Sequence, residues 1–193
     1  MTSQKCLRVL IACEFSGIIR EAFIKRFHDA WSCDLLPSEI PSEYHIQGDI
    51  KDYLDGDWDL MIAHPPCTFI CRNRARQNKQ ENKEIDISLF MTLFNADIPQ
   101  ICIENPVPSK AANLPPYTQI IQPYEHGHDH SKKTCLWLKN LPKLEPTNMI
   151  EISYVTTKGG HRYTKGWYEM PRTSTARSRT FTGIAGAMAE QWG

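Results

Sequence analysis

The sequence has no long hydrophobic run and no excess of charge of either sign. No apolar stretch approaches the roughly 20 residues that a membrane-spanning helix needs, so we expect no membrane contact. The N-terminus MTSQKCLRVLIAC lacks a signal-peptide layout, because its apolar run is short and leads straight into an expected core strand. The seven cysteines are odd in number and scattered. This argues against a disulfide framework and favours a cytoplasmic location.

What is present suits one globular domain. The 193 residues are 41% hydrophobic, with 22 Lys and Arg against 22 Asp and Glu. The zero net charge hides an asymmetry: residues 1–60 carry 6 basic and 11 acidic side chains, whereas residues 130–193 carry 10 and 4. A basic C-terminal third suits contact with phosphates, although a solvated surface has the same composition.

Short apolar runs alternate with segments of helical periodicity, which predicts an α/β fold with a mostly parallel, doubly wound sheet. In such a sheet ligands bind at the carboxyl ends of the strands. We therefore expect a site formed by residues 15–17, Asp34, Asp49, 65–67 and 104–106. The expected strands are 7–13, 31–35, 44–50, 58–63, 100–104, 118–122 and 134–138, and the expected helices are 18–27, 85–96 and 183–191, the last capped by Thr180 or Thr182.

Two reactive side chains follow expected strands. In WDLMIAHPPC, Pro65 and Pro66 end a strand and stiffen the turn that holds Cys67. A lone Cys can equally be a small apolar filler. Glu104 precedes Asn105 and Pro106, where a partly buried carboxyl group would have a raised pKa and could donate a proton, or could simply cap a turn. Together Cys67 and Glu104 form a candidate nucleophile and acid.

Asp34 and Asp49, at successive strand ends, could accept hydrogen bonds from a ribose and an adenine amine, with Gly17 allowing a nucleoside to approach the backbone. They could equally be solvated turn residues. The dinucleotide fingerprint GxGxxG is absent, since the loop reads FSGIIR. This favours an adenosine-containing cofactor without a phosphate.

The motifs EFSG, Asp34, GDI, PPC and EN, in this order and at these strand ends, resemble those of the DNA cytosine-5 methyltransferases. The resemblance runs from about Arg8 to Leu138 and resumes more faintly from Arg177 to Trp192. The segments QPYEHGHDHSKKTCLWLKNLPKL and ARSRTFTGIAGAMAEQW resemble small phage and prophage proteins of this type.

This resemblance implies a Rossmann-like fold that binds S-adenosyl-L-methionine and methylates carbon 5 of cytosine in double- or single-stranded DNA. Cys67 would attack carbon 6 of a flipped or unpaired base, and Glu104 would protonate ring nitrogen 3. The implied cofactor-binding residues are Phe15, Ser16, Gly17, Asp34, Asp49 and Pro65. The implied substrate-binding residues are Pro66, Asn105, Arg72, Arg74, Arg76, Lys133, Arg177 and Arg179.

The chain departs from the family pattern in three places. The second glycine of the usual FxGxG loop is missing, and the QxRxR strand has no clear copy, so Lys133 is the candidate for its arginine. An irregular basic insertion at 139–179 stands where the family has a large target-recognition domain. Two alternatives stay open: the same chemistry on a free cytidine nucleotide or RNA, and a non-catalytic methyltransferase-like binder that interferes with restriction.

Two other chemistries fit less well. His126, His128 and His130 alternate near Cys135, but alternation in a glycine-containing loop fixes no shared metal geometry, so we expect polar loop histidines and no metal. A zinc deaminase would show H-x-E and P-C-x-x-C, and neither is present. Amino-methyltransferases carry an aromatic residue after Pro-Pro, where this chain has Cys67; this favours attack at carbon, with activity on the exocyclic amine left open.

Overall fold

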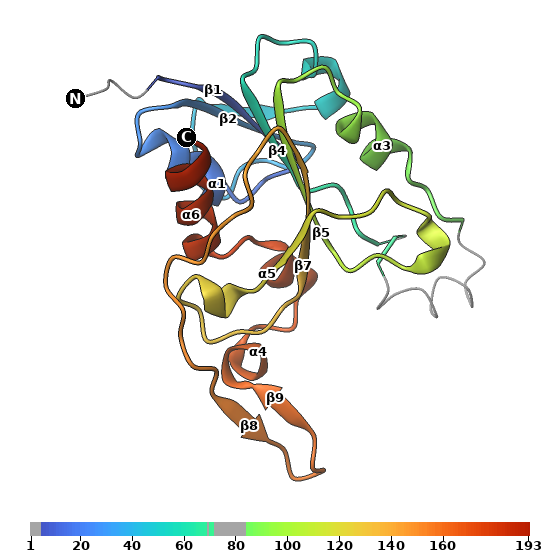
Figure 1. Cartoon of the computed structure of the whole chain (residues 1–193), viewed down its shortest axis with the longest axis vertical. Helices are drawn as coiled ribbons and strands as arrows, with labels where there is room; N and C mark the ends of the chain where they lie inside the picture. Colours follow the sequence, from blue (N-terminus) through green and yellow to red (C-terminus); the bar gives the residue numbers. More distant parts are fainter. Residues whose placement is uncertain (1–4, 69, 72–83) are drawn as a thin grey trace.

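The centre of the protein is a mixed sheet of seven strands in the order β3-β2-β1-β4-β5-β7-β6 (Figure 1). The computed structural model describes residues 5–68, 70–71 and 84–193. All the expected strands are present, so the expected α/β class with a mostly parallel sheet is confirmed. The strands are β1 (Arg8–Ala12), β2 (Asp29–Asp34), β3 (His45–Gln47), β4 (Leu60–Ala63), β5 (Gln100–Pro106), β6 (Gln119–Ile121) and β7 (Thr134–Lys139).

Strands β1 to β5 run parallel, and β7 runs antiparallel to both of its neighbours, β5 and β6. The chain builds outward from β1 to β2 and β3, then returns to place β4 on the other side of β1. The switch point of the sheet therefore lies between β1 and β4. In open α/β sheets, ligands bind at the carboxyl ends of the two strands beside this point.

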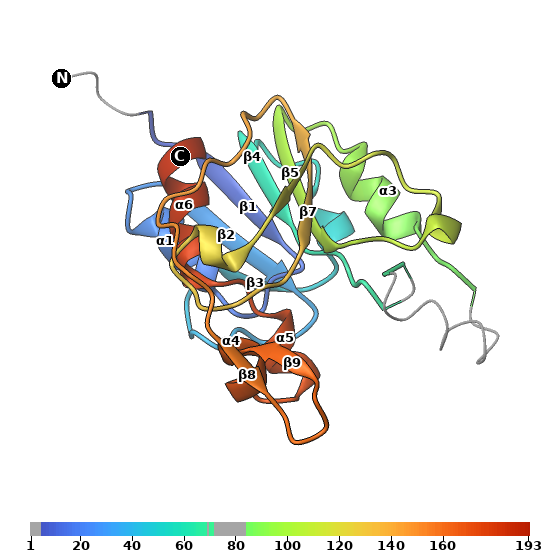
Figure 2. The ribbon, with the colours of Figure 1, turned by 60° about the horizontal axis from the view of Figure 1, so that its bottom comes forward.

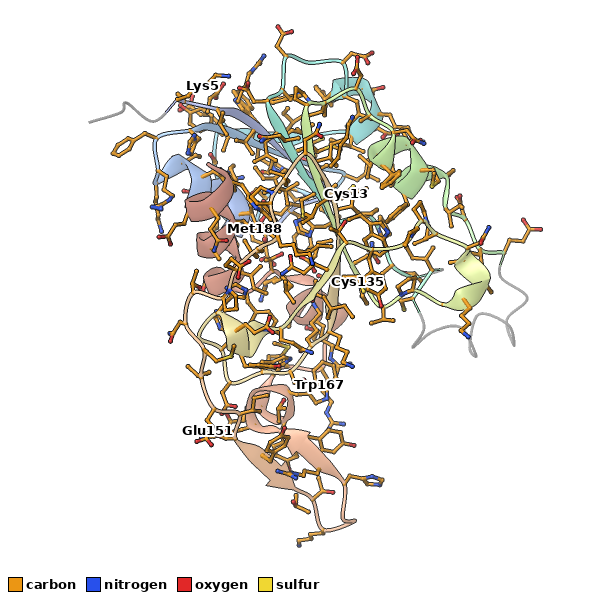
Figure 3. All side chains as sticks on the ribbon, in the orientation of Figure 1. Lys5, Cys13, Cys135, Glu151, Trp167 and Met188 are labelled. Carbon is orange, nitrogen blue, oxygen red and sulfur yellow. The ribbon has the colours of Figure 1, made fainter. Side chains whose placement is uncertain are left out.

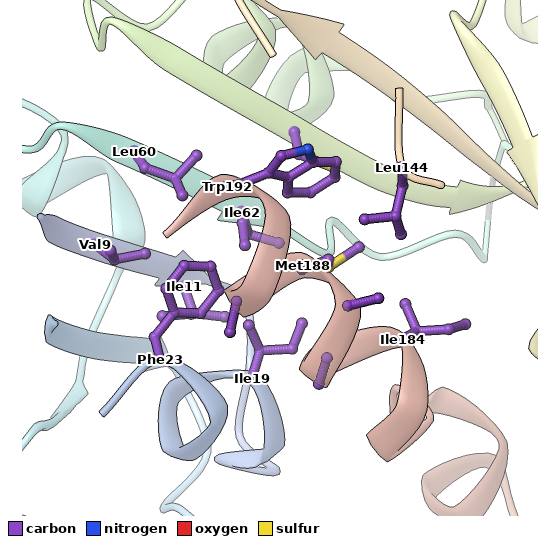
Figure 4. Close-up of a cluster of buried hydrophobic side chains, with 14 of the residues drawn as sticks. Val9, Ile11, Ile19, Phe23, Leu60, Ile62, Leu144, Ile184, Met188 and Trp192 are labelled. Carbon is purple, nitrogen blue, oxygen red and sulfur yellow. The ribbon is translucent and has the colours of Figure 1, made fainter. Parts of the chain in front are cut away.

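Alternating side chains of the central strands supply both faces of the core. Val9 and Ile11 point into one apolar cluster, whereas Leu10 and Ala12 point into the other. The first cluster lies under α1 (Ile18–Ile24) and α6 (Thr182–Trp192), where Met188 and Trp192 reach the sheet (Figure 4). The second lies under α3 (Ser88–Phe94). Because both faces are covered, the parallel strands read as continuous apolar runs rather than alternating ones.

The segment 139–179, which we expected to be an irregular basic insertion, contains regular secondary structure. Strands β8 (Tyr154–Thr156) and β9 (Arg162–Thr164) form an antiparallel hairpin, followed by the short helices α4 (Lys165–Glu169) and α5 (Ser174–Ser178). The hairpin projects away from the seven-stranded sheet in both views (Figures 1 and 2).

Two boundaries differ from expectation. Strand β5 continues through Asn105 and Pro106 instead of ending at Glu104, because β7 pairs with it as far as Pro106. The N-cap of α6 is Phe181 and makes no side-chain hydrogen bond, so neither Thr180 nor Thr182 caps the helix. Short 3-10 turns occupy Ile50–Tyr53, Lys110–Ala112 and Pro123–Glu125. Within the described parts of the chain, no helix is long and apolar enough to span a membrane.

Candidate active site

The loop after β1 is organised by Glu14, a buried residue that the sequence reasoning did not single out as a site residue. Its Oε1 accepts hydrogen bonds from the Oγ of Ser16 and the backbone N–H of Ile19, both at 2.9 Å. Glu14 thereby satisfies one of the free N–H groups in the first turn of α1. Its other oxygen, Oε2, is buried and has no hydrogen-bond partner among the described residues. A buried acceptor without a donor suits a site that a ligand completes.

Gly17 has a packing role that the sequence reasoning did not predict. Its φ of 74° lies in the left-handed region, and a Cβ atom there would lie 2.7 Å from Nη2 of Arg20. Arg20 is fully buried and donates to the Oγ of Ser32 at 2.7 Å and to the carbonyl of Ile40 at 2.8 Å. The space beside Gly17 is therefore filled by the protein itself. The expected approach of a ligand to the Gly17 backbone stays a prediction.

The expected cofactor-binding carboxylates lie at the carboxyl ends of β2 and β3. Asp34 accepts a hydrogen bond from the N–H of Leu36 at 2.9 Å, and the exposed Asp49 accepts one from Lys51 at 3.1 Å. These bonds orient each carboxylate and use only one of its oxygens. Burial raises the pKa of the neighbouring Cys13 thiol to about 12, and the negative charges of Asp34 and Asp49 add to this effect.

Cys13 marks the switch point itself. It directly follows β1, and its φ of 57° is a left-handed conformation that non-glycine residues rarely adopt. Figure 3 labels it near the centre of the molecule. The negative charges of Asp34 and Asp49 both contribute to the raised pKa of this thiol. Phe15, in the same loop, is half-buried.

A buried hydrogen bond ties the loop after β4 to β5. Nδ2 of Asn105 donates to the carbonyl of Pro65 at 2.9 Å, and both residues are buried. Pro66 is exposed, and Cys67 is partly exposed, with its carbonyl accepting from the N–H of Cys71 at 3.0 Å. Asn105 was expected to contact substrate. In this structure its Nδ2 holds the loop that carries Cys67 against the strand that carries Glu104, and the substrate contact stays a prediction.

Glu104 forms an ion pair with His64, a second residue that the sequence reasoning missed. Oε2 of Glu104 lies 3.0 Å from Nδ1 of His64 and accepts a hydrogen bond from Oγ1 of Thr180 at 3.4 Å. The two side chains of the ion pair are only 13% and 14% exposed, respectively. The signal was available in the sequence, because His64 directly precedes the two prolines.

This pairing reverses the expected pKa shift of Glu104. Burial alone would raise the pKa of this carboxyl group, but the hydrogen bond and charge of His64, with the charge of Lys132, outweigh burial and lower it. Burial likewise lowers the pKa of His64, and the hydrogen bond and charge of Glu104 outweigh it and give a raised pKa. The expectation of a raised pKa for Glu104 is therefore wrong.

Lys132 adds a positive charge near the candidate site. Burial raises the pKa of Cys67, as does the neighbouring Cys71 thiol, whereas the charge of Lys132 opposes the rise. The same lysine acts on His64 and Glu104. The charge of this one lysine therefore affects the pKa values of the Cys67 thiol, the His64 imidazole and the Glu104 carboxyl group. Lys133, the residue expected in this role, is exposed.

The arginines that were expected to bind DNA differ in their surroundings. Arg179 forms a bidentate ion pair with Glu39, with both N–O distances 2.7 Å, so its guanidinium fastens the C-terminal segment to the β2–β3 loop. Arg177 lies over the ring of Trp167 at 4.5 Å. The other three expected DNA contacts, Arg72, Arg74 and Arg76, lie outside the described residues.

The three alternating histidines have separate surroundings. His126 hydrogen-bonds Thr147 at 3.1 Å, Nε2 of His128 accepts from the N–H of Gly183 at 2.9 Å, and the ring of His130 packs against Phe181. Burial lowers the pKa of all three. Among the described residues, no group of three or more His, Cys, Asp or Glu side chains is placed to hold a metal ion.

Comparison with known proteins gives only a distant likeness. No family model matches the chain, and no curated protein matches it. A solved structure of the Entamoeba histolytica methyltransferase EhMeth is similar at 15% sequence identity with a TM-score of 0.48. The match covers 78% of this chain and 59% of that chain. The chain therefore spans less than two thirds of EhMeth, and a likeness at this level defines neither a family nor a substrate.

Proposed function

We propose that this chain is an S-adenosyl-L-methionine-dependent methyltransferase that modifies carbon 5 of cytosine in DNA. The observation that carries the proposal is the link between the loop that carries Cys67 and the strand that carries Glu104, at the carboxyl ends of β4 and β5. The hydrogen bond of 2.9 Å from Asn105 to Pro65 forms this link, and the charge of Lys132 acts on both Cys67 and Glu104. A thiol and a carboxylate on linked segments at a ligand-binding edge suit covalent attack on a polarised ring.

The residues around β1 fit the proposed cofactor. Asp34 and Asp49 are hydrogen-bond acceptors suited to the hydroxyl and amine groups of an adenosine, and both act on Cys13 at the switch point. The second carboxylate oxygen of the buried Glu14 lacks a donor. We therefore assign cofactor binding to the loop 13–17, Asp34 and Asp49. When bound, S-adenosylmethionine supplies an electrophilic methyl group on a sulfonium.

The chemistry assigns a separate task to each residue of the site. The Cys67 thiolate bonds to carbon 6 of cytosine, which turns carbon 5 into a nucleophilic enamine carbon. After carbon 5 has gained its methyl group, a base removes the carbon-5 proton and the bond between carbon 6 and sulfur breaks, returning the thiolate. Only the thiolate attacks, and since burial raises the pKa of Cys67, Lys132 is the side chain that favours its ionisation.

The ion pair modifies the expected role of Glu104. Near neutral pH its lowered pKa leaves a carboxylate, which can accept a hydrogen bond from cytosine but has no proton to give. The adjacent His64, with a raised pKa, carries a proton 3.0 Å away on the same hydrogen bond. We assign His64 as the positioning residue that resupplies Glu104 when ring nitrogen 3 needs a proton.

The test uses two cysteine variants and labelled cofactor. Wild-type protein is expected to transfer methyl groups to DNA and to form a covalent adduct with DNA containing 5-fluorocytosine, because a carbon–fluorine bond cannot lose a proton. Cys67→Ala should do neither, whereas Cys6→Ala, which alters an exposed cysteine near the N-terminus, should do both.

Each other outcome points to a different conclusion. Transfer that survives in Cys67→Ala would refute the covalent route and favour an exocyclic amine as acceptor. Transfer to RNA or free cytidine nucleotides but not to DNA would identify the alternative substrates. If no substrate is methylated while DNA or cofactor binding persists unchanged in Cys67→Ser, the chain is a non-catalytic binder.

A further inference from the structure

Away from the carboxyl ends of the central strands, a pocket of about 120 Å³ lies between β9, α4 and α5. Its lining combines three aromatic rings with two guanidinium groups and includes no carboxylate. The lining residues are Tyr163, Trp167, Tyr168, Arg172 and Arg177. Neither the reaction proposed above nor the expected cofactor site uses this pocket.

The pocket is preformed, because its central ring is fixed on two sides. The guanidinium of Arg177 lies 4.5 Å from the ring of Trp167, which is labelled in Figure 3, and the ring of His130 meets Trp167 edge-on at 5.6 Å. The helix that carries Trp167 rests directly on the loop before β7: the N–H of Gly166 donates to the carbonyl of Asp129 at 3.0 Å, and a Cβ at Gly166 would lie 2.2 Å from that oxygen. A ligand therefore meets rings that are already ordered.

The pocket also adjoins the candidate active site. The carbonyl of Arg177 accepts a hydrogen bond from Nζ of Lys132 at 3.1 Å, and Lys132 is the cation that acts on Cys67 and Glu104. Three residues after Arg177, Thr180 donates to Glu104. A chain-like ligand that places one unit at Cys67 could therefore place a neighbouring unit in the aromatic pocket.

The surface around the pocket also combines aromatic rings with basic side chains. Arg162 lies over the ring of Tyr154 at 3.8 Å on the β8–β9 hairpin. Tyr154, Tyr163 and Tyr168 are 49%, 39% and 48% exposed. Residues 150–180 hold six Lys and Arg against two Glu. Aromatic faces interleaved with basic groups match the stacked bases and phosphates of a single strand, whereas a duplex keeps its base faces stacked inside.

We propose that this aromatic pocket stacks an unpaired base of a single-stranded nucleic acid, next to the cytosine at Cys67. The inference deepens the proposed function and rests on it for the place of the target base. Binding itself needs no methyl transfer, so the two can be tested apart. Single-stranded DNA and RNA share the recognised chemistry, and the experiment separates them.

The experiment measures fluorescence anisotropy of labelled oligonucleotides of about 12 residues, within the range of single-strand site sizes. DNA, RNA and duplex DNA of one sequence are titrated with each protein. We expect a single strand to bind more than tenfold tighter than the duplex. Because stacking one base contributes roughly 5- to 150-fold in affinity, Tyr168→Ala should weaken single-strand binding by about tenfold, and Tyr168→Phe should restore it.

The matched control is Tyr117→Ala. Tyr117 is 42% exposed and packs against Trp137 on the α3 side of the sheet, so its loss should leave binding unchanged. A salt series separates stacking from charge: Arg172→Gln should reduce the slope of log affinity against log salt by about 0.7, as for one phosphate contact, whereas Tyr168→Ala should not change it.

The proposal is overturned if Tyr168→Ala binds single strands as wild type does, if the duplex binds as tightly as the single strand, or if no oligonucleotide binds. Tighter binding of DNA or of RNA identifies the natural strand, and equal binding means that the pocket ignores the sugar; each supports base stacking. Intact binding without any methyl transfer would count against the proposed reaction alone.

Discussion

Replacing His64 with Gln removes the cation of the largely buried ion pair at the candidate site. Glu104 then loses its 3.0 Å partner, but the hydrogen bond from Thr180 and the charge of Lys132 remain. Removing one partner of a buried ion pair typically costs about 3–5 kcal/mol of folding free energy, because the other charge stays desolvated. With two compensating groups still in place, we expect the low end, about 3 kcal/mol.

The pH dependence gives this prediction its sharpest form. His64 has a raised pKa in the folded protein, so its contribution is complete below its ordinary value of 6.5 and is lost as pH rises through the folded value. Glu104 has a lowered pKa, so its contribution is complete above its ordinary value of 4.5 and is lost as pH falls through the folded value. The stability gap between wild type and His64→Gln should therefore be widest between those two ordinary values.

The assay is urea unfolding of wild type, His64→Gln, Glu104→Gln and the double variant at about pH 4, 5.5 and 9. The double-mutant cycle isolates the pairwise energy from the cost of each change alone. Thermal unfolding gives a second measurement. At about 2–4 °C per kcal/mol for a chain of this size, the unfolding midpoint of His64→Gln should lie about 6–12 °C below that of wild type near pH 5.5. A stability gap that stays constant across this pH range would refute the ion pair.

Three further predictions follow from the site. Gly17→Ala should destabilise the fold by about 2 kcal/mol in urea unfolding, because its Cβ would meet Arg20 and its φ is positive; wild-type stability would contradict this account. Asp34→Asn should weaken binding of S-adenosylhomocysteine by about 10- to 100-fold in calorimetry without loss of fold, and unchanged affinity would remove Asp34 from the site. The pH profile of kcat/KM should be bell-shaped in wild type, because reaction needs protonated His64 and ionised Cys67, whose pKa values are both raised. In His64→Gln only a rise with pH should remain, and a bell retained in that variant would exclude His64.

The strands and the edge at which the candidate residues gather could be predicted from local pattern. A buried parallel strand is a short apolar run, and prolines or a glycine-containing loop end it, so LRVLIA and LMIA were recognisable without tertiary information. The direction of such strands then puts their following loops at one edge. Cys67, Glu104, Asp34 and Asp49 were placed at that edge by this reasoning alone.

The chemistry of the site depended on partners that are distant along the chain. Arg179 meets Glu39 across 140 positions, and Thr180 meets Glu104 across 76. Lys132 lies just before the antiparallel β7, whose pairing with β5 brings Thr134 opposite Pro106. No pattern within one segment records that register.

The sequence by itself determined which segments become strands and which side chains stand at their ends, because hydrophobic alternation and chain-breaking residues act over a few neighbouring positions. Only the tertiary structure decided that His64 lowers the pKa of Glu104 and that Arg20 fills the space on one side of Gly17. Desolvation, ion pairing and steric contact depend on distance in space, and folding brings those groups together from separate parts of the chain.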